Sequence, residues 1–222
     1  MRFIQGEKIF SGKNYITGNK IIVLNEKNNF VEFTSDTEIE KSKIEIHNGI
    51  LCPGFVNAHC HLELSHLFKK IKPAQGLPAF AFEVVSQRNS FNDEEKIEAM
   101  FNADLQMQKN GIVAVGDISN DKSTIEIKRI SKIHYHTFVE LIGLKPENAQ
   151  EIFSRGISLQ REFLSNSLSS SLAAHAPYSV SPQLMKLIFE QNNKNENSSC
   201  IHNQESLEEE KFLSGEKNLL SD

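Results

Sequence analysis

The sequence contains no tryptophan and only three cysteines among its 222 residues. Cys52, Cys60 and Cys200 are widely spaced and odd in number, which argues against a disulfide framework and fits a reducing compartment. Although Cys60 and Cys200 lie close to histidines, we interpret both as small buried hydrophobes. No run of about eighteen apolar residues exists, so no segment is expected to span a membrane. The N-terminus MRFIQGEKIF lacks the features of a signal peptide. We therefore expect a cytoplasmic protein without a membrane partner.

A strong net charge of either sign is lacking. The net charge is −5, with acidic and basic residues interspersed. This pattern does not predict a basic surface that would bind nucleic acid. The common phosphate-binding loops, Gly-x-x-x-x-Gly-Lys and Gly-x-Gly-x-x-Gly, are absent. Cys-x-x-Cys is absent too, which excludes the small zinc deaminase fold. We expect a small-molecule substrate, and the sequence leaves a homo-oligomer open.

What the sequence does contain is a pair of histidines in the stretch LCPGFVNAHCHLELSHL, residues 51–67. A Pro-Gly turn and a short apolar run lead to His59 and His61. On a β-strand, alternate side chains share a face, so the two imidazoles would project together roughly 7 Å apart at Cα. Such a pair can share one metal ion, whereas a helical pair needs a spacing of three or four. The alternative is two polar residues on a solvated strand face.

Residues 1–50 are predicted to form a small antiparallel β domain. Short strand-like runs are separated by glycine and asparagine turns, a pattern typical of antiparallel sheets. The predicted strands are 8–10, 15–16, 20–24, 30–33 and 43–46.

Residues 51–222 are predicted to form an α/β domain in which strands alternate with helices. Repeated strand–helix units indicate a parallel sheet with helices outside. Asn92 can cap one of the helices, and Ser181 followed by Pro182 can begin another. The predicted strands are 55–60, 112–117, 135–142, 172–176 and 200–202, and the predicted helices are 76–87, 93–109, 122–132, 149–163, 182–191 and 206–213. About five units result, and they suit an open doubly wound sheet as well as a barrel.

Polar residues close four otherwise apolar strands: Asp117, Glu140, His175 and His202. In a barrel, working residues lie at the carboxyl ends of the strands and face one mouth. Asp117 and Glu140 fit either of two roles, orienting metal ligands or capping the following helices. His134 and His136 begin their strand, at the end associated with stability, and we interpret both as structural.

The stretch PGFVNAHCHLELS resembles the first barrel strand of the amidohydrolase superfamily, in its hydrolytic deaminase and chlorohydrolase branch. The resemblance implies a (β/α) TIM-type barrel, with the N-terminal segment forming half of a β-sandwich. It also implies that His59 and His61 bind a catalytic divalent metal and that His202, in SCIHNQES, is the third metal histidine. Three nitrogen ligands leave a position for water, as expected of a catalytic site. The alternative for His202 is a strand-end histidine without a metal.

Two further residues follow from the same resemblance. Glu205 matches the glutamate that shuttles protons between the metal-bound water and the ring nitrogen of the substrate. His175, in LAAHAPYSVSP, matches a histidine that faces bound substrate. Glu63 and His66 follow the first strand and are candidates for substrate contact, with an exposed loop charge and a surface histidine as the alternatives.

The implied reaction is hydrolytic deamination of a purine-like heterocycle, with water acidified by the metal as nucleophile. The cofactor is one divalent metal ion, with zinc the default and iron an alternative, because imidazole ligands suit both. HCHLELSHL is somewhat similar to enzymes acting on aminofutalosine and adenosine-type compounds. Chlorohydrolases and imidazolone hydrolases of the superfamily use similar frames.

The implied barrel is incomplete in these 222 residues. A closed barrel needs eight units and about 250 residues, so we expect the chain to stop about three units early. The superfamily places a further histidine after the sixth strand and a metal-binding aspartate after the eighth, beyond the units predicted here. Without that carboxylate as proton acceptor, we predict an active full-length parent but little or no activity for this chain alone. The alternative is a truncated barrel that serves only as a metal-binding or interaction module.

Overall fold

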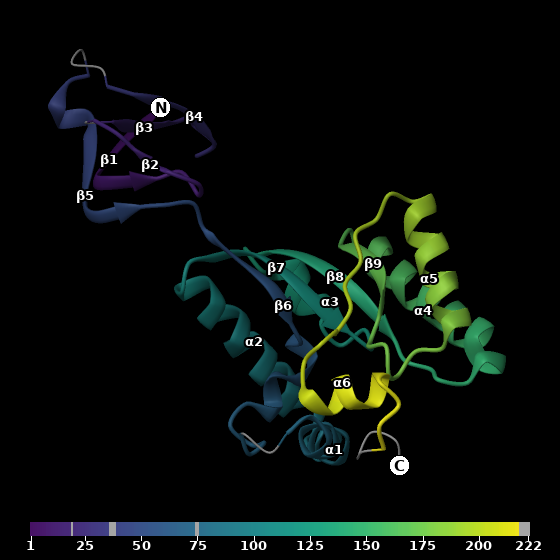
Figure 1. Ribbon diagram of the computed structural model, residues 1–222. Helices are drawn as coiled ribbons and strands as arrows, with labels where there is room; N and C mark the ends of the chain where they lie inside the picture. Colours follow the sequence, from purple (N-terminus) through teal and green to yellow (C-terminus); the bar gives the residue numbers. More distant parts are fainter. Residues whose placement is uncertain (19, 36–38, 74–75, 218–222) are drawn as a thin grey trace. The chain divides into compact units, whose positions relative to one another are not determined.

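The computed structural model describes residues 1–18, 20–35, 39–73 and 76–217 (Figure 1). The chain divides into two compact units, Met1–Gly54 and Phe55–Asp222. Among the described residues, every helix is too short or too polar to cross a lipid bilayer.

The first unit is a five-stranded sheet. Its strands are β1 (Arg2–Phe10), β2 (Tyr15–Ile16), β3 (Ile21–Leu24), β4 (Phe30–Thr34) and β5 (Ile44–Leu51), and the short 3-10 helix η1 (Lys41–Lys43) precedes β5. The pairs β1–β2, β1–β3 and β3–β4 are antiparallel, as predicted. β5 instead runs parallel to β1, from the pair Phe3–Ile44 to the pair Ile9–Leu51. Turn residues reveal hairpins between neighbouring strands, so the pairing of the first strand with the last was not predictable from them.

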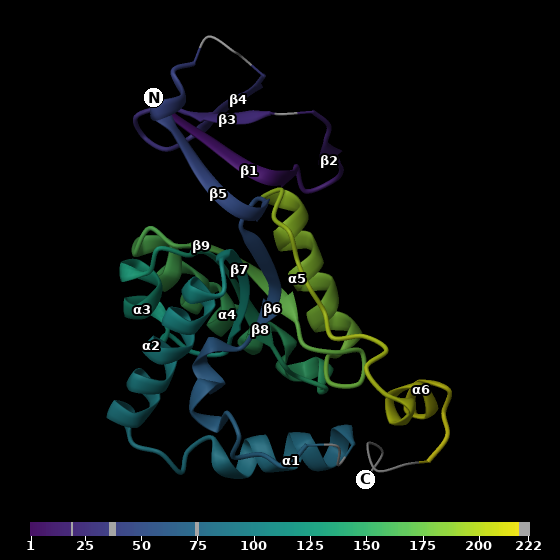
Figure 2. The same cartoon turned by 90° about the vertical axis from the view of Figure 1, so that its left-hand side faces the viewer.

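The second unit is built on a four-stranded parallel sheet in the order β6-β7-β8-β9. Its strands are β6 (Phe55–Cys60), β7 (Ile112–Ser119), β8 (His134–Leu141) and β9 (Ser169–Ala174). Its helices are η2 (Leu62–Leu67), α1 (Leu77–Gln87), α2 (Asp93–Lys109), α3 (Ile125–Ile130), η3 (Pro146–Asn148), α4 (Ala149–Ser165), α5 (Pro182–Lys194) and α6 (Leu207–Leu213). Figures 1 and 2 show α1 and α6 beyond the carboxyl ends of the strands.

Local capping signals explain where the long helices begin. Asn92 accepts a hydrogen bond from the backbone N–H of Glu95 at 2.9 Å, and the Glu95 carboxylate accepts one from the N–H of Asn92 at 3.0 Å. This reciprocal pair stabilises the first turn of α2, which spans the predicted residues. Ser181 likewise caps α5, with Pro182 at its first position.

Apolar side chains from the sheet pack against the helices in two buried clusters. In one of them, Val139 and Leu172 of the sheet meet Phe163 of α4 and Leu184 of α5, all of them fully buried. The other joins η2, α2 and α3 to β7 and β8. Alternate residues of each strand therefore face the helices, and the intervening residues face the opposite side of the sheet.

The predicted fifth strand, residues 200–202, is not a strand in the structure. The segment does lie against the end of β9, because the backbone N–H of His202 donates to the carbonyl oxygen of His175 at 2.7 Å. A strand requires a ladder of such bonds, and the backbone hydrogen bonds of the described residues give this segment just one to β9's end. The prediction of a strand was wrong, but the expected position of His202 beside the sheet is observed.

Candidate functional site

β6 presents His59, and His61 follows directly after its last residue, through a local irregularity in the pairing of β6 with β7. The register shifts between Asn57 and Cys60, as in a β-bulge, which redirects side chains at the end of a strand. The Asn57 side chain accepts a hydrogen bond from the N–H of His59 at 3.3 Å and contacts the sulfur of Met107 in α2. Asn57 thus fixes the backbone from which the histidine pair projects.

The structure brings His202 together with both histidines of this pair. One ligand atom from each of the three side chains lies within 4.8 Å of the others. The ring centroids of His59 and His202 are 4.7 Å apart, and those of His61 and His202 are 5.6 Å apart. Residues separated by more than a hundred positions in the sequence therefore form one cluster at the carboxyl end of the sheet.

The chemistry of this cluster fits a cation that binds neutral imidazoles. Burial lowers the pKa of His61 to about 4, and burial together with the charge of His202 lowers the pKa of His59. Nδ1 of His61 and Nε2 of His202 are buried without a hydrogen-bond partner among the described residues. Unpaired buried nitrogens are costly in a folded protein unless something binds them. A divalent metal ion would be bound by one nitrogen of each ring of the cluster.

Two carboxylates flank His202. Its Nε2 lies 3.2 Å from Oε1 of Glu140, a short contact without hydrogen-bond alignment, and its Nδ1 lies 3.3 Å from Oε1 of Glu205. The Glu140 carboxylate, followed by that of Glu205, raises the pKa of His202. Burial alone would raise the pKa of Glu140, but contacts with His202 and Asn120 outweigh it and lower that pKa. Without a metal, protonated His202 would compensate the buried carboxylate.

His175 lies next to the triad, with its ring centroid 5.0 Å from that of His202. Its Nδ1 is 2.6 Å from the Ser179 hydroxyl, which donates its own proton to the carbonyl oxygen of Ala176 at 3.2 Å. A hydroxyl has one proton to give. With that proton on the Ala176 contact, Nδ1 of His175 donates to Ser179 and Nε2 carries the free lone pair. Burial lowers the pKa of His175, which favours this neutral form.

Glu63 and His66 are both buried, so the alternatives of an exposed loop charge and a surface histidine are wrong. The reason is that η2 folds back against the sheet and α2. Oε2 of Glu63 accepts a hydrogen bond from the N–H of Asn120 at 2.8 Å, and burial raises the pKa of Glu63 to about 8. Oε1 of Glu63 has no hydrogen-bond partner among the described residues. Contact between Glu63 and substrate stays a prediction.

Two strands of the sheet carry an acidic residue near their carboxyl ends. Glu140, near the end of β8, lies in the site, whereas Asp117 of β7 contacts η2 and α3 and supports the site from there. Asp117 accepts a hydrogen bond from the N–H of Leu62 at 2.8 Å and pairs with Lys128 of α3 at 2.6 Å. It thereby holds the backbone directly after His61. Two supporting residues, Asn120 and Ser179, were not identified from the sequence, because short polar residues after a strand carry no signal of their partners.

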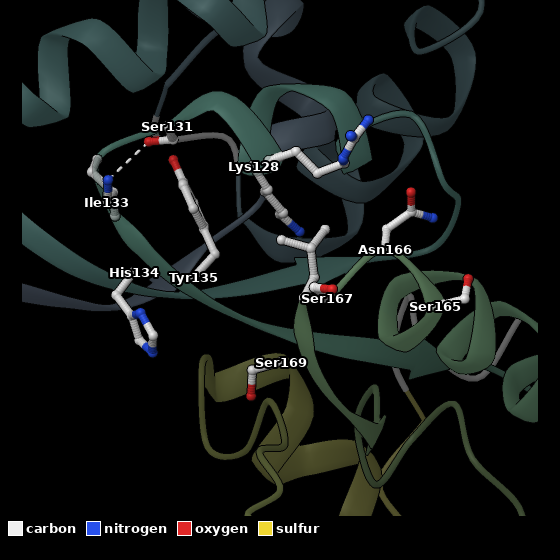
Figure 3. Close-up of a pocket in the computed structure, with 11 residues that line it drawn as sticks. Lys128, Ser131, Ile133, His134, Tyr135, Ser165, Asn166, Ser167 and Ser169 are labelled. Atoms are coloured by element: carbon white, nitrogen blue, oxygen red, sulfur yellow. Dashed lines mark hydrogen bonds between the residues drawn. The ribbon is translucent and has the colours of Figure 1, made fainter.

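A separate cavity of about 620 Å³ lies at the opposite end of β8 and β9 (Figure 3). Its wall combines the start of β8, including His134 and Tyr135, with the turn that leads into β9. Several of its polar groups are already bonded: Ser131 donates to Asp104 at 2.6 Å and accepts from the N–H of Ile133 at 3.0 Å. None of the clustered histidines lines this cavity. The cavity is therefore not the candidate site, despite its volume.

A model of the amidohydrolase family matches residues 50–217, most of the chain. The chain belongs to the amidohydrolase family. The match covers the clustered histidines and both flanking carboxylates, and it agrees with the resemblance of the first strand.

Relatives of this family member fall in the predicted deaminase and chlorohydrolase branch. A curated adenosine deaminase of Helicobacter pylori is 27% identical over 173 residues, which are 77% of this chain and 41% of that protein. The solved H. pylori aminofutalosine deaminase, in complex with methylthio-coformycin, superposes with a TM-score of 0.80 at 21% identity, over 99% of this chain and 55% of that one. Atrazine chlorohydrolase from Arthrobacter aurescens, complexed with zinc, gives a TM-score of 0.72 at 15% identity, over 100% of this chain and 58% of that one.

The chain therefore spans about half the length of the relatives that it matches. These relatives are amidohydrolase TIM-barrel proteins, and this chain has the α/β architecture of the part that they share, preceded by the β domain.

Proposed function

We propose that this chain carries the metal centre of a hydrolytic deaminase that acts on a purine-like heterocycle. The observation that carries the proposal is the meeting of His59, His61 and His202, whose ligand atoms lie within 4.8 Å of one another. Two buried nitrogens of this cluster have no hydrogen-bond partner among the described residues. Three nitrogen ligands with a remaining open position are typical of catalytic zinc. Relatives with bound zinc support zinc over iron.

The metal would supply a nucleophile near neutral pH by acidifying water. Glu205 is the residue of this chain that would move the proton, because its carboxylate lies beside His202 at the edge of the cluster. The loop position of Glu205 is fixed, since its backbone N–H donates to Oε2 of the buried Glu209 at 2.8 Å. A proton carrier must be held within hydrogen-bond reach of the reacting atoms, and this bond provides such support.

His175 would orient the substrate. Its Nε2 is a free acceptor, since Nδ1 is held by Ser179, and a ring N–H or amino group of a heterocycle is a matching donor. The ring of Tyr178 stands perpendicular to that of His175 at 5.8 Å and adds an aromatic wall. The similarity to an adenosine deaminase and to an enzyme solved with methylthio-coformycin supports a purine-like substrate.

Metal analysis of the purified chain tests the metal centre. We expect one tightly bound zinc ion, which His59→Asn, His61→Asn or His202→Asn abolishes or weakens by several orders of magnitude. His134→Asn is the matched control, because His134 lies at the other end of β8 and is exposed. Zinc binding that survives all three substitutions would contradict the proposed centre.

Ammonia release by the complete gene product tests the reaction. Adenosine-type nucleosides are the first substrates to try, with chelator-treated protein as the control. Chloride release from a chlorotriazine would instead favour a chlorohydrolase, in line with the fold of atrazine chlorohydrolase. Zinc binding without any turnover would favour the alternative of a metal-binding module. The same assay on the 222 residues alone checks the prediction that they have little or no activity.

A further inference from the structure

Asn120 lies directly after β7 and contacts two buried carboxylates that belong to different elements. Its backbone N–H donates to Oε2 of Glu63 in η2 at 2.8 Å, and its side-chain amide donates to Oε2 of Glu140 in β8 at 3.0 Å. The same amide also donates to the backbone carbonyl oxygen of Glu140 at 3.3 Å. We propose that Asn120 is a positioning residue that joins the two sides of the histidine triad.

One side of this link leads to the histidine pair. Glu63 is the second residue of η2, and η2 begins directly after His61. Both partners of a buried hydrogen bond are restrained, because leaving either group unpaired costs free energy. The bond from the N–H of Asn120 therefore holds the first turn of η2 at the end of β7, and it restrains the backbone that follows His61.

The other side of the link leads to His202. Asn120 holds Oε2 of Glu140, and Oε1 of the same carboxylate lies 3.2 Å from Nε2 of His202. The Glu140 side chain is only 4% exposed, so few other partners can reach it. A carboxylate beside a metal-binding imidazole sets the orientation of that ring. The position of His202 therefore depends on Asn120 through Glu140.

Sheet register brings the members of this link together. β7 and β8 are parallel neighbours, and Ser119 is paired with Val139. The next residue of each strand segment, Asn120 and Glu140, therefore lie side by side at the carboxyl edge. A paired strand end is a firmer support than an isolated loop, because the ladder of backbone hydrogen bonds fixes its position.

Zinc affinity of the purified chain, measured against a competing chelator, tests this role, which rests on the proposed function. Asn120→Leu removes the side-chain donor but keeps the backbone N–H. Loss of an outer partner of a metal ligand typically weakens metal binding by about 10- to 100-fold. Because Asn120 acts through a further residue, we expect a loss of about 10-fold, the lower value. Circular dichroism verifies folding, and Asn120→Ala removes the same donor if the leucine variant does not fold.

Asn166→Leu is the matched control. Asn166 is also half-buried, and its side-chain amide donates to the carbonyl oxygen of Glu162 at 2.9 Å. It lies in the turn that leads into β9, at the opposite end of the sheet from the triad. The substitution should leave zinc affinity unchanged, and a loss equal to that of Asn120→Leu would overturn the inference.

A double variant distinguishes positioning from a general effect on the fold. Residues that act in one network have non-additive effects. Asn120→Leu combined with Glu140→Gln should therefore bind zinc as Glu140→Gln alone does. A further loss in the double variant, equal to the loss in Asn120→Leu by itself, would show that Asn120 does not act through Glu140 and would overturn the inference.

Imidazole resonances of the metal-free chain give a readout that does not need zinc. In ¹H–¹⁵N spectra at one fixed pH, Asn120→Leu should shift the ring signals of His202 and leave those of the exposed His134 unchanged. Unchanged His202 signals together with unchanged zinc affinity would overturn the inference, while zinc binding that depends on the triad would leave the proposed function intact. Shifted His202 signals in a chain that binds no zinc would support the link and contradict the proposed metal centre.

Discussion

The ammonium nitrogen of Lys128 lies 2.6 Å from Oδ2 of Asp117, and both side chains are fully buried. Lys128 also donates to Thr137 at 2.8 Å, while the other oxygen of Asp117 accepts from the N–H of Leu62 at 2.8 Å. The ion pair therefore joins α3, β7, β8 and η2. Removing one partner of a buried pair leaves the other charge uncompensated, which typically costs about 3–5 kcal/mol. We expect Lys128→Met to lower the free energy of unfolding by about that amount.

Arg129→Met is the matched control for this prediction. Arg129 follows Lys128 on the same helix and forms an exposed ion pair with Glu126 at 2.9 Å. Exposed pairs contribute roughly 0–1 kcal/mol. Urea unfolding of both variants measures the difference, and equal losses would show that burial of the Lys128–Asp117 pair has no special effect on stability.

Glu205→Gln should separate metal binding from catalysis in the active enzyme. The substitution preserves the shape of the side chain but removes its capacity to accept and return a proton. Loss of a positioned acid–base group typically lowers kcat by about 10²- to 10⁴-fold, and we expect a decrease in this range with zinc content unchanged. Glu210→Gln, also an exposed position of the same segment, should leave kcat unchanged. A Glu205→Gln enzyme with normal kcat would exclude the proposed proton shuttle.

His66 should contribute to the pH dependence of stability. Its Nε2 lies 3.2 Å from the carbonyl oxygen of Arg88 and donates to it, and its Nδ1 is buried without a hydrogen-bond partner among the described residues. Burial lowers the pKa of His66. The unfolded chain then binds more protons than the folded one between the lowered pKa and about 6.5. The contribution of His66 to the free energy of unfolding is therefore fully present above about pH 6.5. It is lost as the pH falls towards the lowered pKa of His66.

Unfolding free energies at about pH 7.5 and pH 5.5 bracket the unfolded-state pKa of histidine and check this expectation. The decrease between the two values should be smaller in His66→Gln than in the unmodified protein. His134→Gln serves as the comparison, because His134 is exposed. The same decrease in His66→Gln as in the unmodified protein would mean that His66 does not titrate in this window.

The three cysteines should differ in reactivity. Burial, followed by the negative charge of Asp117, raises the pKa of Cys60 to about 12, and burial raises the pKa of Cys200 to about 11. Cys52 is exposed. Because the thiolate is the reactive form, iodoacetamide at about pH 8 should label Cys52 well before the other two. Mass spectrometry of the alkylated peptides measures the order, and equal rates in the folded protein would contradict it. In urea all three should react alike.

Helix boundaries were predictable where a local signal marks them. The predicted helix at residues 93–109 agrees with α2, because the Asn92–Glu95 capping pair is encoded within four residues. The helix predicted at residues 122–132 is shorter in the structure, Ile125–Ile130. Its flanks instead serve tertiary contacts: Lys122 pairs with Glu162 at 3.3 Å, and Ser131 donates to Asp104 at 2.6 Å. Local propensity does not predict such contacts.

The sequence by itself determined the histidine pair, because a spacing of two at a strand end brings His59 and His61 together, and it determined the strand–helix alternation of the four strands that precede His202. A backbone hydrogen bond to His175, and not a fifth strand, places His202 beside that pair. The tertiary structure alone decided which neighbours complete the site. The contacts that join Asn120 to Glu140, Ser179 to His175 and Asp117 to Lys128 depend on packing of separate elements. Hydrogen bonds between side chains that follow different strands leave no periodic pattern in the sequence, since only the register of the sheet brings those side chains within bonding distance.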